Sequence, residues 1–94
     1  MIRMPRICKK LEIRNKHGLH ARAAALLVRT INKFSSKVNV SKDGVSTDGR
    51  SIMGVLTLGA SQGSKIQIEA VGEDAEKAVR AIEKLVENRF NEPE

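Results

Sequence analysis

His20 is the residue of this chain best placed to do chemistry, because a strand-like segment ends shortly before it and a helical pattern begins directly after it. The first backbone N–H groups of a helix have no partners inside that helix, and together with the helix dipole they favour an anion at this end. A neutral imidazole nitrogen is a competent nucleophile. We therefore expect His20 to accept a phosphoryl group, and Arg22 to direct a planar cationic group at the same phosphoryl oxygens.

The residues around His20 support this interpretation without removing the alternatives. Gly18 gives the backbone the freedom for a sharp turn into the helix, and Leu19 can pack inward so that the next side chain faces out. A histidine before a helix is also common as a plain polar cap. His17 could assist His20, compete with it as a second acceptor or lie exposed, and we favour the exposed position.

A second segment of interest begins at Ser51, which precedes the short apolar run of residues 52–56. A serine in this place can cap a short helix, and Gly54 keeps such a helix brief. Ser51 therefore has two interpretations, a helix cap only or a regulatory phosphorylation site. So short a helix cannot bury every side, and we expect a partner-binding surface there that combines Leu19, Ile52, Met53 and Leu56 with the basic residues Arg22 and Arg50.

Hydrophobic periodicity predicts the elements that must position these residues. Two-residue alternation predicts strands at 7–13, 37–41, 45–47 and 66–70, with a hairpin turn at 42–44. Helical spacing predicts one helix at 21–33 and a second that begins after a cap at Asp74 and has a buried stripe ending with Phe90. Residues 91–94 are expected to form a frayed polar tail. The pattern is that of an α+β fold, a four-stranded antiparallel sheet with helices on one side, in a single domain spanning 1–94.

Composition narrows the classes of function. The chain has 94 residues, of which 40% are hydrophobic, enough for one small core but not for a deep catalytic cleft. A net charge of +6 allows an acidic partner, a membrane surface or nucleic acid, but the chain has no Trp or Tyr for base stacking and only Phe34 and Phe90. We therefore expect no nucleic-acid ligand.

The single cysteine and the hydropathy pattern indicate in which cellular compartment the protein is expected. Cys8 alone permits no internal disulfide and no Cys/His metal spacing. No apolar run is long enough to span a membrane, and residues 1–6 carry charges but lack the apolar run of a signal peptide. We expect a cytoplasmic protein without membrane insertion.

Two separate motifs resemble those of the HPr family, the histidine phosphocarrier proteins of the bacterial phosphoenolpyruvate-dependent phosphotransferase system. Gly18-Leu19-His20-Ala21-Arg22-Ala23-Ala24 is similar to the active-site stretch of that family, and residues 50–59, Arg-Ser-Ile-Met-Gly-Val-Leu-Thr-Leu-Gly, are similar to its regulatory-serine segment. The resemblance runs from about Ile7 to Phe90. It implies an HPr-like open-faced β-sandwich of βαββαβα order, with three helices on one face of four antiparallel strands.

The resemblance also implies roles for individual residues. His20 would take a phosphoryl group on Nδ1 from phosphorylated enzyme I and pass it to a IIA protein or domain, with Arg22 as its electrostatic partner. In some lineages a dedicated HPr kinase/phosphorylase would modify Ser51. The protein would then be a monomeric carrier with a covalent phosphohistidine intermediate, needing no cofactor and having no enzymatic turnover of its own.

Some residues leave the branch of the family open. Ala23 stands where the family often has proline, and the His-Ala-Arg-Ala-Ala-Ala form is closer to the nitrogen-related branch called NPr. The Ser-Ile-Met-Gly-Val segment is equally typical of carriers of the sugar pathway. His17 occupies a position that is often Asn or Leu.

Three classes of function therefore compete: a phosphoryl shuttle, a regulatory docking module that uses the short helix, and a small basic RNA-binding domain. The shuttle is favoured because it alone uses His20, Arg22 and the helix start together.

Overall fold

The computed structural model of the chain describes residues 4–92, so the predictions for residues 1–3 and 93–94 lie outside the described residues. Its elements follow the predicted order: β1 (Arg6–Glu12), α1 (Ala21–Ile31), β2 (Lys37–Lys42), β3 (Val45–Asp48), α2 (Ile52–Thr57), β4 (Lys65–Val71), α3 (Ala75–Glu87) and a short turn at Arg89–Asn91.

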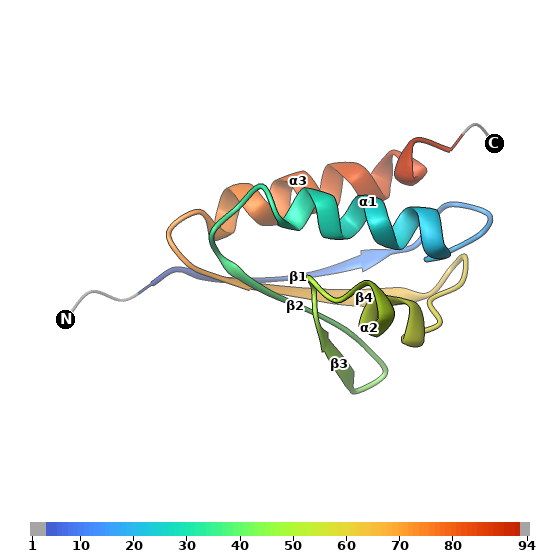
Figure 1. The fold of residues 1–94 in the computed structure, drawn as a ribbon, viewed down its shortest axis with the longest axis horizontal. Helices are drawn as coiled ribbons and strands as arrows, with labels where there is room; N and C mark the ends of the chain where they lie inside the picture. Colours follow the sequence, from blue (N-terminus) through green and yellow to red (C-terminus); the bar gives the residue numbers. More distant parts are fainter. Residues whose placement is uncertain (1–3, 93–94) are drawn as a thin grey trace.

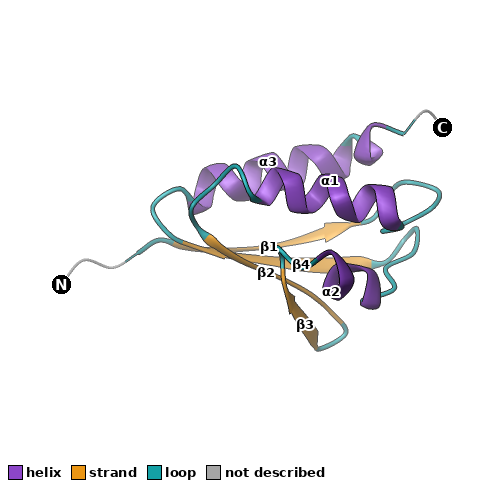
Figure 2. Cartoon of the chain, viewed as in Figure 1, coloured by secondary structure: helices purple, strands orange, loops and turns teal. Residues whose placement is uncertain are grey.

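The four strands form one antiparallel sheet in the order β1-β4-β2-β3. The helices α1 and α3 lie side by side over one face of this sheet, and α2 packs against α1 and β3 (Figures 1 and 2). The predicted α+β fold with an open-faced four-stranded sheet and three helices is confirmed. No helix within residues 4–92 is long and apolar enough to cross a membrane.

The register explains the core. Leu11 pairs with Ile66 and Val40 with Ile68, so alternate side chains of the strands face the helices, where they pack against the apolar stripes of α1 and α3. The predicted turn between β2 and β3 occurs at Asp43 and Gly44, both with positive φ (50° and 83°), as a two-residue hairpin requires. Gly54 also lets α2 approach β3 closely, because a Cβ at this position would lie 1.9 Å from the Thr47 hydroxyl oxygen.

Asp74 was predicted to cap the last helix, and its side chain does not do so. Asp74 does precede α3, but its side chain makes no capping hydrogen bond to that helix. Its carboxylate instead accepts hydrogen bonds from the backbone N–H groups of Ser35 (2.8 Å) and Ser36 (2.9 Å) and from both serine hydroxyls. Asp74 therefore fixes the loop between α1 and β2.

The prediction for the chain end was also wrong. The last helix ends at Glu87, and Arg89, Phe90 and Asn91 then take positive φ values of 56°, 53° and 61°. Phe90 is fully buried, as expected, but it reaches the core from this turn and not from the helical stripe. The segment through Glu92 is consequently folded against the molecule, where the sequence had suggested a frayed tail.

Candidate functional site

The candidate site lies at one end of the molecule, where the β1–α1 loop, the α2–β4 loop and the end of α3 gather (Figure 1). Backbone hydrogen bonds join the first two loops, from Ile13 to the Ser64 carbonyl and from Leu19 to the Ala60 carbonyl (both 2.8 Å). Gly18 has a φ of +64°, and a Cβ there would lie 2.4 Å from the Ala60 carbonyl oxygen. The prediction that Gly18 permits the sharp turn before His20 is therefore confirmed.

His20 occupies the N-cap position of α1, as predicted, with extended backbone angles and no side-chain hydrogen bond to the helix. The first intrahelical hydrogen bond runs from the Ala24 N–H to the His20 carbonyl (2.8 Å), so the N–H groups of the three residues between have no acceptor inside the helix. The first turn carries no acidic residue. The start of α1, on which His20 lies, thus favours an anion.

Arg22 is exposed at the second residue of α1. Among the hydrogen bonds and ion pairs of residues 4–92, none involves its guanidinium group. The fork of N–H donors is therefore available to a ligand at the start of the helix.

The site also contains Glu92, which sequence reasoning missed. One carboxylate oxygen, Oε2, contacts Nε2 of His20, and the other, Oε1, accepts a hydrogen bond from Nδ2 of Asn15 (3.0 Å). The His20 side chain is one-third exposed, whereas that of Glu92 is only 7% exposed. Because Nε2 faces the carboxylate, Nδ1 is the ring nitrogen left for other chemistry.

The charge of Glu92 depends on these two contacts. Burial by itself would raise the pKa of the Glu92 carboxyl group, but the hydrogen bonds from His20 and Asn15, with the positive field of the two histidines, outweigh it. The net effect lowers the pKa below its ordinary value. Glu92 is therefore ionised at neutral pH and faces the imidazole as an anion.

His17 is exposed, as we favoured, and its ring meets that of His20 edge to face, with centroids 5.8 Å apart. His17 also helps to lower the pKa of the Glu92 carboxyl group. His17 is thus a second histidine at the site, and a test of His20 needs it as a control.

The predicted partner-binding surface is only partly exposed. Ile52 (42%) and Met53 (73%) are exposed on α2, and Leu56 is half-buried against the core. Leu19 is buried, 5% exposed, which confirms that it packs inward and corrects its assignment to the docking surface.

Arg50 also has a different place from the one predicted. Its guanidinium donates to the carbonyls of Phe34 (2.7 Å) and Ser36 (3.0 Å), just beyond the end of α1. A half-buried cation used in this way ties the loop after α1 in place, and it complements the negative end of the helix dipole. Arg50 belongs to the fold and is not a free contact residue.

Ser51 is the N-cap of α2, and its Oγ accepts a hydrogen bond from the Gly54 N–H at 3.0 Å. The predicted capping role is confirmed. The regulatory interpretation of Ser51 stays a prediction.

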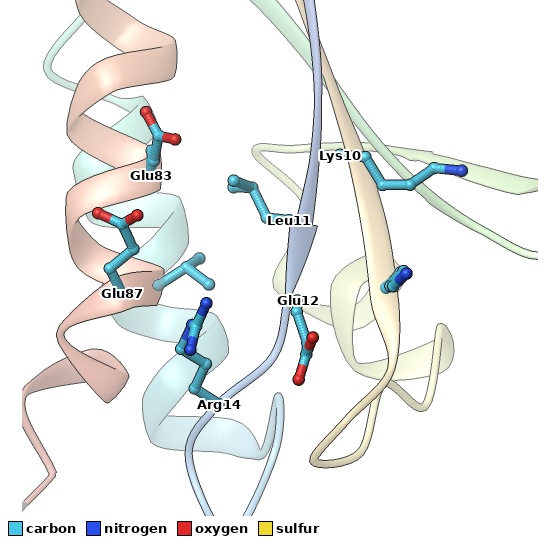
Figure 3. Close-up of a pocket in the computed structure, with 8 residues that line it drawn as sticks. Lys10, Leu11, Glu12, Arg14, Glu83 and Glu87 are labelled. Atoms are coloured by element: carbon cyan, nitrogen blue, oxygen red, sulfur yellow. The ribbon is translucent and has the colours of Figure 1, made fainter.

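A pocket between β1 and α3 is lined by Leu11 and a mixture of charged side chains, among them Glu83 and Glu87 of α3 and Arg14 after β1 (Figure 3). None of the residues that line it is a histidine, serine or cysteine. Its acidic and basic groups are mixed, so it offers no uniform positive field for an anion. Within residues 4–92 no cluster of His, Cys, Asp or Glu is suited to a metal ion.

The chain is similar to known proteins over most of its length. Residues 7–88 match the family model described as "PTS HPr component phosphorylation site". The chain is 49% identical over 83 residues to the phosphocarrier protein HPr of Xylella fastidiosa strain Temecula1, covering 88% of this chain and 93% of that protein. It is 45% identical over 73 residues to the multiphosphoryl transfer protein of Salmonella typhimurium, covering 74% of this chain but 19% of that larger protein.

Among solved structures, a crystal structure of HPr from Thermoanaerobacter tengcongensis superposes with a TM-score of 0.90 at 45% identity, covering 94% of this chain and 99% of that one. An HPr from Bacillus anthracis gives 0.83 at 38% identity, with 86% and 96% covered.

Proposed function

The chain belongs to the HPr family of phosphocarrier proteins of the phosphotransferase system, and from this premise we propose that His20 is the residue that carries the phosphoryl group. In this proposal His20 receives the group from phosphorylated enzyme I and delivers it to a IIA protein or domain. The protein is a covalent carrier between enzymes and not itself a turnover catalyst.

The position of His20 at the N-cap of α1 is the observation that carries the proposal. A phosphoryl group on this ring would bring its negative oxygens to the end of a helix whose first N–H groups have no internal acceptor. Arg22, with its guanidinium uncommitted among the described residues, supplies positive charge at the same end. His20 also remains partly exposed, so a partner's active site can reach it.

The choice of ring nitrogen follows from the Glu92 contact. Because the carboxylate engages Nε2, an incoming phosphorus atom meets Nδ1. The lone pair of Nδ1 forms the new N–P bond while the bond from phosphorus to the donor breaks, and its electron pair leaves with the donor. Transfer onward to the acceptor protein is the reverse of this step.

Two exposed apolar side chains support a docking surface next to the site. Ile52 and Met53 project from α2, which packs against α1. Met adapts its shape to different contacts, which suits a carrier that must bind a donor and an acceptor in turn. We assign the partner contact to these two residues with the exposed edge of Leu56.

The test is incubation of the whole protein with phosphoenolpyruvate and enzyme I, followed by intact-mass measurement. We expect one acid-labile phosphoryl group on the wild-type protein and on His17→Ala, and none on His20→Ala. Uptake by His20→Ala together with its loss in His17→Ala would move the acceptor to His17. A protein that takes up no phosphoryl group at all would overturn the carrier function.

A further inference from the structure

Asn15, Glu92 and His20 form a continuous chain of polar contacts between residues that are far apart in sequence. Asn15 is fully buried in the β1–α1 loop, and its amide Nδ2 donates both to the Gly18 carbonyl (2.8 Å) and to Oε1 of Glu92 (3.0 Å). The second oxygen of Glu92 contacts Nε2 of His20. One carboxylate thus links a fixed amide to the ring that carries the chemistry.

The end of the chain is built to hold Glu92 in this place. Three consecutive residues other than glycine, 89–91, have left-handed φ values, a run that is rare for L-residues and needs support from the surrounding structure. The enforcing contacts are the buried Phe90 ring and the hydrogen bonds from the Asn91 N–H to the Asn88 carbonyl and from the Glu92 N–H to the Arg89 carbonyl (both 3.0 Å). Glu92 therefore meets His20 from a fixed turn.

The hydrogen bonds of the buried Asn15 amide show that this position requires a donor. Both of its contacts are to acceptors, so its NH₂ group must face them, and its Oδ1 is buried without a partner among the described residues. A buried acceptor without a hydrogen-bond partner destabilises the fold. The Asn15 amide therefore contributes through its two N–H donors, which orient the Gly18 carbonyl and the Glu92 carboxylate.

We propose that Asn15 and Glu92 are positioning residues that hold His20 with a proton on Nε2 and the Nδ1 lone pair free for phosphoryl transfer. The inference rests on the proposed carrier function and deepens it. A carboxylate can only accept a hydrogen bond, so the nitrogen it faces must donate, and this fixes the tautomer of the neutral ring.

The same arrangement stabilises the product of transfer. When Nδ1 forms the N–P bond, the ring keeps the proton on Nε2 and becomes cationic, while the donor keeps the electron pair of the broken bond. The Glu92 carboxylate then lies against a positive ring, and the hydrogen bond becomes charge-assisted on both sides. Asn15 contributes by keeping the carboxylate from rotating away.

The proposal is tested first on the unphosphorylated whole protein, by measuring the histidine tautomers with ring nitrogen-15 NMR above neutral pH. In the wild type we expect His20 to be protonated almost entirely on Nε2. In Glu92→Gln the amide can face the ring with either a donor or an acceptor, so a substantial share should shift to the Nδ1–H form. Glu87→Gln, a change of the same kind on the exposed last residue of α3, should leave the tautomer as it is.

The second measurement is the rate of phosphoryl uptake from enzyme I. Loss of a carboxylate that orients a metal-bound histidine slows activity by roughly ten- to hundredfold, and we expect a similar reduction in Glu92→Gln and none in Glu87→Gln. Asn15→Ala should slow uptake in the wild-type background but add little in the Glu92→Gln background, because Asn15 acts through Glu92. Melting temperatures separate these effects from unfolding.

The outcomes distinguish this inference from the carrier function. An unchanged His20 tautomer and an unchanged uptake rate in Glu92→Gln would overturn the role of Glu92, even though the protein still carries phosphate. Independent, multiplying effects of the two substitutions would overturn the role of Asn15. If the wild type took up no phosphoryl group, the carrier function would fail, and the tautomer measurement would still decide whether Glu92 controls the ring.

Discussion

At the scale of single residues, the site separates three tasks among three kinds of side chain. His20 offers a nucleophilic nitrogen, Glu92 engages the opposite ring nitrogen, and Arg22 carries an uncommitted positive charge. The two charged groups differ in how strongly the fold holds them. Glu92 is buried and hydrogen-bonded, whereas Arg22 is exposed, so a change at Arg22 should affect transfer without affecting the fold.

Replacement of Arg22 by Ala should slow phosphoryl uptake by roughly ten- to hundredfold, because a lost charge-assisted contact removes about 1.5–3 kcal/mol if it is fully expressed in the transition state. The melting temperature should change little, since the side chain is exposed. Stopped reactions analysed by intact mass would give the rate. Arg29→Ala, at another exposed arginine in the last turn of α1, is the matched control, and a wild-type rate in both variants would remove Arg22 from the site.

At the scale of secondary structure, local patterns predicted most elements correctly. Alternation located all four strands, helical spacing located α1 and α3, and the serine cap before an apolar run located α2. The ends differ by a few residues: β1 ends at Glu12 instead of Ile13, α1 at Ile31 instead of Lys33 and α3 at Glu87 instead of Phe90. Arg50, from the loop before α2, binds the carbonyls of Phe34 and Ser36 in the segment after α1. No local pattern contains that contact.

The candidate site was predictable only in its local part. His20, Arg22 and Gly18 are neighbours in sequence, and their types and spacing define the start of a helix. Glu92 reaches His20 across 72 positions, through a left-handed turn of residues that propensity would not place there. The sequence therefore predicted that Glu92 belongs to a polar tail, whereas in the folded chain it contacts His20.

Ser51 is the element-scale prediction that remains open. In Ser51→Asp the new carboxylate lies at the start of α2, where the free N–H groups and the dipole tolerate a negative charge, so the melting temperature should stay close to that of the wild type. The rate of transfer from enzyme I should fall, because a charge beside Ile52 and Met53 must be desolvated when a partner docks there.

The matched control for Ser51→Asp is Ser51→Asn, which keeps a capping oxygen without the charge. A fall in transfer rate with the charged variant alone supports regulation by phosphorylation. If both variants transfer at the wild-type rate, Ser51 is a helix cap and nothing more.

At the scale of the whole molecule, the two ends of the sheet-and-helix sandwich have different tasks. The end that holds His20 gathers loops around the start of α1, whereas the end that holds Asp74 ties the α1–β2 loop to the start of α3. Arg50 strengthens the same loop through the Ser36 carbonyl. The stability of the fold can thus be altered at Asp74 without touching the chemistry at His20.

The pH dependence of stability follows from the Asp74 carboxylate. Hydrogen bonds from the Ser36 hydroxyl and the Ser35 N–H, opposed by burial and helped by the Ser36 N–H, lower the pKa of Asp74 from 3.8 to about 2. The unfolded chain takes up a proton near the ordinary pKa and the folded chain only near the lower one. The stabilisation is therefore complete above the ordinary pKa and is lost as the pH falls through that window.

We accordingly expect Asp74→Asn to have a lower melting temperature than the wild type at neutral pH, with the difference shrinking as the pH falls from 3.8 to about 2. Thermal unfolding followed by circular dichroism over this range measures it. Asp43→Asn, a change at an exposed turn carboxylate paired only with Lys42 among the described residues, should show a much smaller dependence. Phosphoryl uptake at neutral pH should persist in Asp74→Asn below its melting temperature, because His20 lies at the opposite end of the molecule. A melting-temperature difference that stays constant down to the lowest pH would show that the hydrogen bonds of Asp74 do not depend on its charge.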